Sequence, residues 1–155
     1  MPNTIEIRPV EPGDLPGLCL HQRDDESCAM AAVHPRDDAA FAAHWAKIFG
    51  DPDVVARAIV ADGAVVGQIS CFTMDERRHV GYWIARDHWG RGVATRALAL
   101  ILEEVSERPL WARAARSNGG SIRVLERCGF VLEGYEMSPA TERLVACEEA
   151  VFRLD

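Results

Sequence analysis

The stretch Val80–Leu102, VGYWIARDHWGRGVATRALALIL, carries the strongest structural signal in the chain. It opens with an apolar run typical of a buried strand, and a turn containing Gly90 and Gly92 follows. Beyond this turn apolar residues recur at helical spacing, which indicates an amphipathic helix. The apolar face of that helix consists of Val93, Ala97, Ile101 and Val105. Another strand is predicted at 110–115, so the stretch forms one βαβ unit with two parallel strands.

The remaining elements are predicted from periodicity and from turn residues on either side of this unit. Strands are predicted at 4–10, 54–61, 64–72, 79–86, 110–115, 130–136 and 148–154. Helices are predicted at 15–22 after Asp14, at 39–49 after Asp37 or Asp38, from 93 to the break at Pro109, and from Ser117 or Asn118 to Gly129. Asp62-Gly63 predicts a hairpin turn, and the polar stretches 23–36 and 73–78 are predicted to be connections. The prediction is an α+β fold, with a mixed, mostly antiparallel sheet of about six to seven strands flanked by about four helices.

Length and charge narrow the possible functions. The chain has 155 residues, which fits a single domain spanning 1–155. Its net charge of −7 argues against general binding of nucleic acid, which needs a basic surface. Residues 1–76 hold 13 acidic and 5 basic residues (−8), whereas residues 86–127 hold 8 arginines and 5 acidic residues (+3). We therefore expect a small anionic group to bind the second segment and an amine to meet the first.

Cysteine and histidine spacing indicates neither a disulfide framework nor a metal site. The five cysteines are odd in number and include no CxxC pair, and the five histidines form no HExxH pattern. The first residues lack the basic start and apolar run of a signal peptide, and no window holds 18 uninterrupted apolar residues. We expect a cytoplasmic protein with reduced thiols, no metal and no membrane contact.

The glycine turn predicts a phosphate site. Glycines let successive backbone N–H groups point into one concavity, and the helix N-terminus adds partial positive charge. Arg91 can add charge-assisted hydrogen bonds, and Ala94 is small enough for a ligand to approach the first helical turn. The alternatives are a strand–helix turn without a ligand and a dinucleotide site. A dinucleotide motif needs a third glycine, where Thr95 stands, and an acidic residue near Trp111, and the chain has neither.

A second segment, Ser117–Gly134 (SNGGSIRVLERCGFVLEG), completes a pair of motifs. The pair resembles the GNAT superfamily of acetyl-CoA-dependent N-acyltransferases, and within it the branch of ribosomal-protein N-terminal acetyltransferases. That branch shows a GYW…WG.G.AT.AL segment followed by N..S..VLE..GF. The close likeness covers Val80–Gly134, about a third of the chain. It implies a GNAT-like fold whose central strands diverge beside the long helix and open a slot for acetyl-CoA.

The resemblance also implies which residues bind the cofactor. Backbone groups of Ile84–Arg86 would face the pantetheine arm of acetyl-CoA. The loop Trp89–Ala94 corresponds to the family's Q/R-x-x-G-x-G/A motif for the pyrophosphate, with Trp89 where Gln or Arg is usual. Asn118 matches an asparagine that contacts the cofactor arm. The implied set is Ile84, Ala85, Arg86, Trp89, Gly90, Arg91, Gly92, Val93, Ala94, Thr95 and Asn118.

Acetyl transfer to an amine needs a base for the ammonium, a donor for the carbonyl oxygen and an acid for the thiolate. The resemblance implies that a backbone N–H of the strand before the glycine turn serves the oxygen. His79 stands where the branch often has an acid, and a histidine can act as a base at neutral pH; the alternatives are Glu76 as the base and a purely structural His79. Ser121 matches the branch's serine and would contact the sulfur, unless it is only a helix-surface residue. Leu125 stands where many members have a tyrosine that acts as the general acid. Cys71 has no nearby His or Asn pattern that would support a covalent nucleophile, and it is predicted to be a buried thiol.

We therefore predict an acetyl-CoA-dependent N-acetyltransferase that moves an acetyl group to a primary amine by direct attack in a ternary complex. The acceptor is a protein N-terminus or a small-molecule amine, and the chain is expected to be a monomer or a homodimer. The alternative is a non-catalytic acyl-CoA-binding or regulatory module with the same fold. It stays open because His79 and Leu125 stand where the family often has an acidic residue and a tyrosine. The region around Met30 and Trp45 would adjoin the acceptor site in the family, and Trp45 itself is predicted to be helix core.

Overall fold

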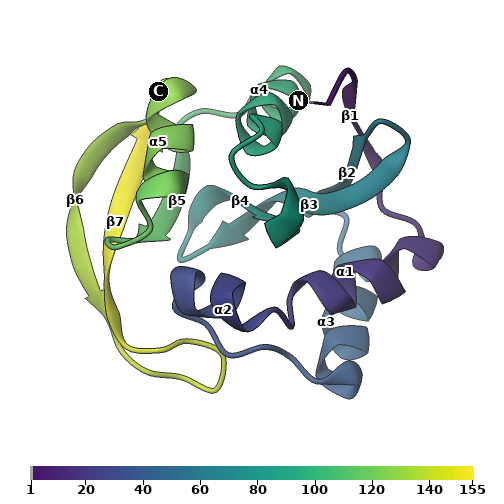
Figure 1. Cartoon of the computed structure of the whole chain (residues 1–155). Helices are drawn as coiled ribbons and strands as arrows, with labels where there is room; N and C mark the ends of the chain where they lie inside the picture. The colour runs from purple at the N-terminus through teal and green to yellow at the C-terminus, as the bar shows by residue number, and fades with distance from the viewer. Residues whose placement is uncertain (1) are drawn as a thin grey trace.

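The computed structural model describes residues 2–155. A seven-stranded sheet is surrounded by five α-helices and two short 3-10 helices (Figure 1). The strands are β1 Ile5–Pro9, β2 Val55–Ala61, β3 Ala64–Met74, β4 Arg77–Ile84, β5 Leu110–Ala115, β6 Val131–Ser138 and β7 Cys147–Leu154. The helices are α1 Leu15–His21, α2 Asp25–Ala31, α3 Asp38–Gly50, α4 Val93–Glu104 and α5 Gly119–Arg127, with 3-10 helices at Pro12–Asp14 and Arg86–His88. The predicted α+β class and the predicted strands are confirmed, and there is one α-helix more than expected.

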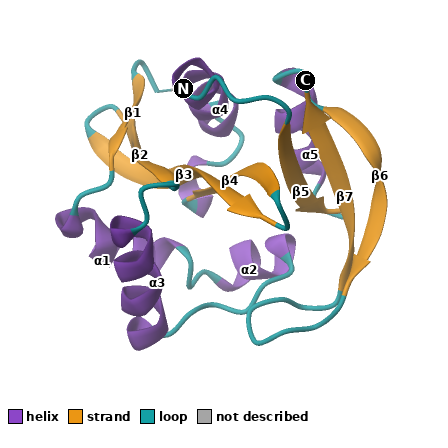
Figure 2. Ribbon diagram, turned by 180° about the vertical axis from the view of Figure 1, so that it is seen from behind, coloured by secondary structure: helices purple, strands orange, loops and turns teal. Residues whose placement is uncertain are grey.

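The sheet separates at its centre. The strand order is β1-β2-β3-β4-β5-β7-β6, and β4 and β5 are the only parallel neighbours. These two strands pair at a single position, His79 with Trp111, whereas β3 and β4 pair at eight. Beyond His79 the edge of β4 has no partner in β5, and the two strands diverge (Figure 2). The predicted divergence of the central strands is therefore confirmed.

Two tight hairpins join β2, β3 and β4. Asp62 and Gly63 both have positive φ, 49° and 85°, as a two-residue hairpin turn requires. The predicted connection at 73–78 is wrong, because β3 and β4 extend into it and leave only Asp75 and Glu76 in the turn. Both turn residues again have positive φ, 52° and 62°. The polar composition of 73–78 misled the prediction, since this end of the hairpin is exposed and polar side chains are compatible with paired strands there.

The predicted loop at 23–36 is also wrong in part, because it contains α2. Asp24 caps this helix by accepting a hydrogen bond from Ser27 N at 2.9 Å, and two acidic residues follow in the first turn, where the helix dipole favours them. Only two of its seven residues are buried. So short a helix shows no apolar periodicity from which it could be predicted.

The other helix ends follow the predicted caps with one exception. Asp37 begins α3 by accepting a backbone hydrogen bond at 2.7 Å, and Asn118 begins α5 in the same way at 3.2 Å. Gly129, with a φ of 91°, follows the end of α5. Asp14 precedes α1, but its carboxylate pairs with Arg8 instead of capping that helix.

Helices cover both faces of the sheet. α4 lies on one side of β1–β4 and α1 to α3 on the other, while α5 lies beside β5 (Figure 1). The larger apolar cluster, between the sheet, α4 and α5, includes Ile69, Leu98 and Phe152, none of which is more than 1% exposed. A smaller cluster joins α1 and α3 to the sheet, and Trp45 is 3% exposed within it. Trp45 is therefore core, as predicted.

Candidate active site

A cavity of about 580 Å³ lies where β4 and β5 diverge, and we call it the main cavity. Its walls come from β4, the glycine turn, the start of α4, α5 and α2. The predicted site residues that line it are Ile84, Trp89, Gly90, Gly92, Val93, Ala94, Thr95, Asn118 and Ser121. No Asp or Glu of residues 2–155 is among its lining residues. The fold thus brings the two sequence motifs together around one space that has no acidic wall.

The glycine turn places backbone donors at one end of the main cavity. Gly90 and Gly92 have left-handed φ values of 73° and 76°, which residues with a Cβ rarely adopt. Gly92 is the N-cap of α4, and no side chain caps this helix. The first N–H groups of a helix have no partner within it, so those of Val93, Ala94 and Thr95 are left for an anion.

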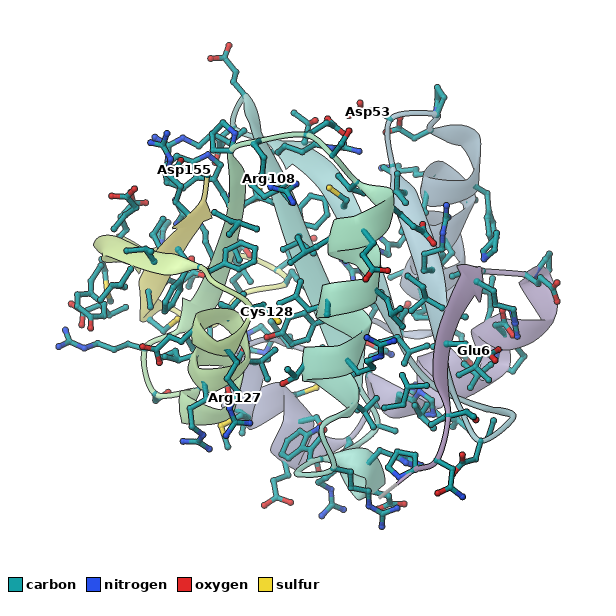
Figure 3. All side chains as sticks on the ribbon, turned by 90° about the horizontal axis from the view of Figure 1, so that it is seen from above. Glu6, Asp53, Arg108, Arg127, Cys128 and Asp155 are labelled. Atoms are coloured by element: carbon teal, nitrogen blue, oxygen red, sulfur yellow. The ribbon has the colours of Figure 1, made fainter. Side chains whose placement is uncertain are left out.

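Basic side chains line the same cavity. They are His88 beside the glycine turn and Arg123 and Arg127 on α5. Arg127 is labelled on α5 in Figure 3. The predicted Arg91 is exposed and is not among the lining residues. None of these three lining residues was among the predicted site residues, although the charge of +3 over 86–127 was a signal for the two arginines.

The end of β4 is tied to its surroundings. Trp89 Nε1 donates a hydrogen bond of 2.9 Å to the carbonyl of Ile84, which holds the indole at the cavity wall. Ala85 and Arg86, which were predicted site residues, do not line the cavity. The N–H of Ala85 donates to a carbonyl of β3 at 2.8 Å. The guanidinium of Arg86 lies 2.8 Å and 3.0 Å from two carboxylates at the start of α2, so this side chain links β4 to α2.

Tyr82 of β4 and Ser121 of α5 meet in the wall of the main cavity. Their hydroxyl oxygens are 2.8 Å apart, and Tyr82 Oη also lies 3.3 Å from the Ser121 carbonyl oxygen. Burial raises the pKa of Tyr82 to about 12, so its hydroxyl stays protonated at neutral pH. Asn118 Oδ1 accepts from the Ser121 N–H, which leaves the Asn118 amide donors for the cavity. The sequence analysis did not assign Tyr82 to the site, and its place in the Gly-Tyr-Trp motif was the only signal.

His79 lies where β4 and β5 meet, opposite Trp111, and is not among the lining residues. It is 3% exposed and stacks on Phe72 with ring centroids 6.0 Å apart. Its Nδ1 is 3.0 Å from the carbonyl oxygen of Arg77, and because a carbonyl only accepts, Nδ1 carries the proton and Nε2 the lone pair. Burial lowers the pKa of His79 below 6.5, so the ring is neutral at pH 7. Glu76 is exposed in the β3–β4 turn, away from the lining residues.

Two further positions named by the sequence analysis are buried. Leu125 is fully buried in the larger apolar cluster, so no hydroxyl acid occupies that position. Cys71 is 1% exposed, and burial raises the pKa of its thiol. Cys71 is the buried thiol that was predicted.

Within residues 2–155, no group of three or more His, Cys, Asp or Glu side chains is placed to hold a metal ion. The same residues include no helix that is both long and apolar enough to cross a membrane.

Known proteins with related sequences agree with this geometry. The sequence profile of the acetyltransferase (GNAT) domain matches residues 4–131. The "Putative ribosomal N-acetyltransferase YdaF" of Bacillus subtilis (strain 168) is 31% identical over 97 residues, which is 58% of this chain and 53% of that protein. The "Uncharacterized N-acetyltransferase p20" of Bacillus licheniformis is 23% identical over 143 residues, 84% of this chain and 80% of that protein. The match therefore spans about half the length of the first relative and most of the second.

Solved structures share the whole fold. Spermidine N-acetyltransferase from Vibrio cholerae, in complex with CoA and spermine, matches with a TM-score of 0.80 at 17% identity, over 96% of this chain and 92% of that chain. RimJ of Mycobacterium smegmatis, in complex with CoA-disulfide, matches with a TM-score of 0.78 at 21% identity, over 97% of this chain and 81% of that chain.

The separated sheet and the uncapped start of α4 agree with the fold that the resemblance to the GNAT superfamily implied, and the family profile covers most of the chain. The chain belongs to the GNAT acetyltransferase family. Its domain is an N-acetyltransferase domain, and its motifs resemble those of the ribosomal-protein acetyltransferase-like branch.

Proposed function

We propose that this chain, acting as one domain over 1–155, transfers an acetyl group from acetyl-CoA to a primary amine that attacks directly in a ternary complex. The observation that carries the proposal is the main cavity, which has free helix N–H groups at one end and the Tyr82–Ser121 pair in its wall. Its lining is basic and holds no carboxylate, which suits a polyphosphate ligand. We place the protein in the cytoplasm, which its five unpaired cysteines support.

The residues of the main cavity fit this ligand. The N–H groups of Val93–Thr95 would hold the pyrophosphate, with Arg123 and Arg127 adding positive charge. The unpaired edge of β4 beyond His79 and the amide of Asn118 would bind the amide groups of the pantetheine arm. Acetyl-CoA supplies an acetyl group activated as a thioester. A backbone N–H on the β4 edge would donate to its carbonyl oxygen as negative charge develops there.

Ser121 is the proposed acid. Tyr82 has one proton, and if Oη donates it to Ser121 Oγ at 2.8 Å, the Ser121 hydroxyl proton is left to point into the cavity. Ser121 Oγ then gives this proton to the leaving sulfur and takes the proton of Tyr82, and solvent water reprotonates Tyr82 Oη, whose raised pKa favours the protonated form. The pair thereby fills the role that a tyrosine at the position of Leu125 would have in other members.

His79 is the proposed base, and it acts through a water molecule because it is 3% exposed and outside the cavity lining. It lies on the same face of β4 as Gly81 and Trp83, since alternate residues of a strand share a face. Its Nε2 has the free lone pair, and the ring is neutral at pH 7 because burial lowers the pKa of His79. Glu76 is the weaker candidate for the base because it lies in the exposed β3–β4 turn.

The exchange His79→Gln is expected to lower kcat by about 100-fold or more, which is the typical contribution of a general base. The lone pair is lost when His79 is protonated, so activity of the wild type should fall only as the pH drops below 6.5, through the lowered pKa of His79. His79→Gln should lose this acidic limb and keep its affinity for CoA, as followed by the pH dependence of kcat/KM and by calorimetry. Glu76→Gln is the matched control in the same hairpin, and a large loss there instead would make Glu76 the base.

Removing either hydroxyl of the Tyr82–Ser121 pair is expected to lower kcat by a similar factor. Tyr82→Phe and Ser121→Ala should each lower kcat about tenfold or more at unchanged affinity for CoA. The double variant should be no slower than the slower single variant, because the two hydroxyls act as one unit. Additive losses in single-turnover rates would show that the two residues act independently.

The proposed function itself is tested with purified protein, acetyl-CoA and a panel of amines and peptides, while the release of free thiol is followed. Thiol release that depends on the acceptor supports transfer. Tight binding of CoA without thiol release on any acceptor would instead support the non-catalytic acyl-CoA-binding module.

A further inference from the structure

A second, smaller cavity of about 70 Å³ lies on the face of β3 and β4 that carries α1 and α3, and we call it the basic cavity. Gln68, Ser70 and Trp83 form its floor on the sheet. His44 of α3 and two arginines from connecting segments, Arg36 and Arg143, lie around it. No Asp or Glu of residues 2–155 is among its lining residues.

Arg36 is held in place through its backbone, and Arg143 through its backbone and through its guanidinium, which donates to the carbonyl of His34. The buried side chain of Gln22 clamps Arg36: Gln22 Nε2 donates to the Arg36 carbonyl at 2.9 Å, and the Arg36 N–H donates to Gln22 Oε1 at 2.8 Å. The β6–β7 connection is fastened to the α2–α3 connection where the N–H of His34 donates to the carbonyl of Arg143 at 2.7 Å. A bridge between Val33 and Leu144 adds to this contact. Segments far apart in the chain are thus joined so that both guanidinium groups reach one cavity.

These two charges have no acidic partner. Within residues 2–155, neither Arg36 nor Arg143 has a carboxylate oxygen within 4 Å. Other basic side chains of this acidic chain do form ion pairs with carboxylates: eleven of these pairs are closer than 4 Å and a twelfth is at 4.0 Å. Burial, and then the charge of Arg36, lowers the pKa of Arg143 to about 10. Burial, followed by the charges of Arg36, Arg143 and Lys47, lowers the pKa of His44 to about 4. The electrostatic field in the basic cavity is therefore positive and uncompensated.

Two half-buried like charges disfavour the folded state unless an anion joins them. A protein with 24 acidic residues has many carboxylates that could neutralise this site, yet none is placed there. Planar guanidinium groups match the geometry of a carboxylate. A volume of about 70 Å³ has room for such a group but for little more.

The basic cavity adjoins the main cavity. Trp83 lines both, and its Nε1 donates to the carbonyl of His21 at 3.1 Å, which fixes the indole between them. An acceptor whose carboxylate lies in the basic cavity can therefore direct a nearby amine past Trp83 toward the main cavity. The basic cavity also lies on the face of β4 that carries His79, the proposed base.

We propose that the acceptor is a primary amine with a carboxylate close to it, and that Arg36 and Arg143 bind this carboxylate. This inference rests on the proposed function and specifies its substrate. Two sources share the chemistry: the carboxylate of a free amino acid, and the side-chain carboxylate of an acidic first residue in a peptide.

The test compares acceptors that differ only in the charge of this group. β-Alanine is compared with β-alaninamide, and the peptide Asp-Ala-Ala with Asn-Ala-Ala, both with amidated C-termini. The charged member of at least one pair should have a kcat/KM at least about tenfold higher, since hydrogen bonds to a charged group contribute enough for this. The pair that shows the preference identifies the source, and equal kcat/KM within both pairs would overturn the proposal.

Arg36→Gln and Arg143→Gln should remove this preference. Each should lower kcat/KM for the preferred charged acceptor about tenfold or more and leave its neutral partner almost unchanged. Arg36→Gln should not lower the melting temperature, because it removes an uncompensated charge, whereas Arg143→Gln also loses the guanidinium hydrogen bond to the His34 carbonyl. A loss of activity in Arg36→Gln is therefore not a loss of folding. Arg108→Gln is the matched control: Arg108 is exposed, outside both cavities, and lies away from Arg127 beyond the end of α4 (Figure 3).

A binding measurement separates the two proposals. Calorimetric titration of the same acceptors into CoA-loaded protein reports on the basic cavity even if no acetyl group is transferred. Charge-dependent binding that Arg143→Gln abolishes would support the carboxylate site even if the proposed transfer failed. Thiol release with acceptors that bind equally well with and without charge would support the transfer and overturn the carboxylate site.

Discussion

Replacing Gly92 by valine is expected to abolish measurable binding of CoA, a loss in affinity of at least about 100-fold. Gly92 has a φ of 76° at the N-cap of α4, and a β-branched residue is strongly disfavoured there. Valine would either rotate the turn or place its methyl groups over the first N–H groups of α4. In both cases the concavity that would hold the pyrophosphate is lost. Calorimetry with CoA, together with a thermal melt, measures the effect.

Gly63→Val is the matched control for Gly92→Val. Gly63 has a φ of 85° in the β2–β3 turn and is not among the lining residues of the main cavity. Both variants introduce the same residue in a left-handed conformation, so both should lose stability, by about 1–2 kcal/mol or more. Only Gly92→Val should lose CoA. If its affinity for CoA were unchanged, the glycine turn would not be the phosphate site.

Replacing Gly67 by alanine is expected to destabilise the protein more than either valine substitution, by about 3 kcal/mol or more, at the upper end for overpacking. A Cβ on Gly67 would lie 2.2 Å from the carbonyl oxygen of Trp83 and 3.1 Å from the Cα of Ile84. These are backbone atoms of the paired strand, which have no rotamer to move into, so β3 and β4 would have to separate. Since Trp83 and Ile84 line the main cavity, affinity for CoA should fall as well.

Gly134→Ala is the control for Gly67→Ala. Gly134 lies in β6, and a Cβ there would meet no heavy atom within 4 Å. Its free energy of unfolding in urea should stay within about 1 kcal/mol of the wild type, whereas that of Gly67→Ala should drop severalfold more. Equal values for the two variants would show that the sheet relaxes at Gly67, and that the close approach of β3 to β4 is not needed for stability.

Local sequence patterns predicted those parts of the fold whose cause is local. The order strand, glycine turn and helix from Val80 onward depends on apolar spacing and on positive φ at Gly90 and Gly92, and both are properties of neighbouring residues. The caps of α3 and α5 were predicted to within one residue for the same reason, and the structure selects Asp37 over Asp38 and Asn118 over Ser117. Apolar spacing did not predict α2, because this helix has too few buried residues to show a helical repeat. It also did not predict the ends of β3 and β4, where the strands stay paired through polar residues.

Charge totals were a weaker guide than their distribution in space. The charge of −8 over residues 1–76 led to the expectation that an amine meets this segment, and that stays a prediction. The basic cavity, which Arg36 and His44 of this segment line, has no acidic lining residue among residues 2–155. Several of those acids are engaged elsewhere, such as Asp24 and Glu26, which pair with Arg86. The net charge of a segment does not say where its side chains point, whereas the potential in a cavity depends mainly on the charged groups that face it.

The sequence by itself determined the family, the βαβ unit and the glycine turn that we propose as the phosphate site, because each depends on residues that are close together along the chain. The tertiary structure alone decided which distant side chains meet. Tyr82 reaches Ser121 because β4 and β5 diverge, and Arg36 lies beside Arg143 because two long connections are hydrogen-bonded to each other. Such contacts leave no periodic trace in a single sequence, since they follow from how packed elements place residues in space.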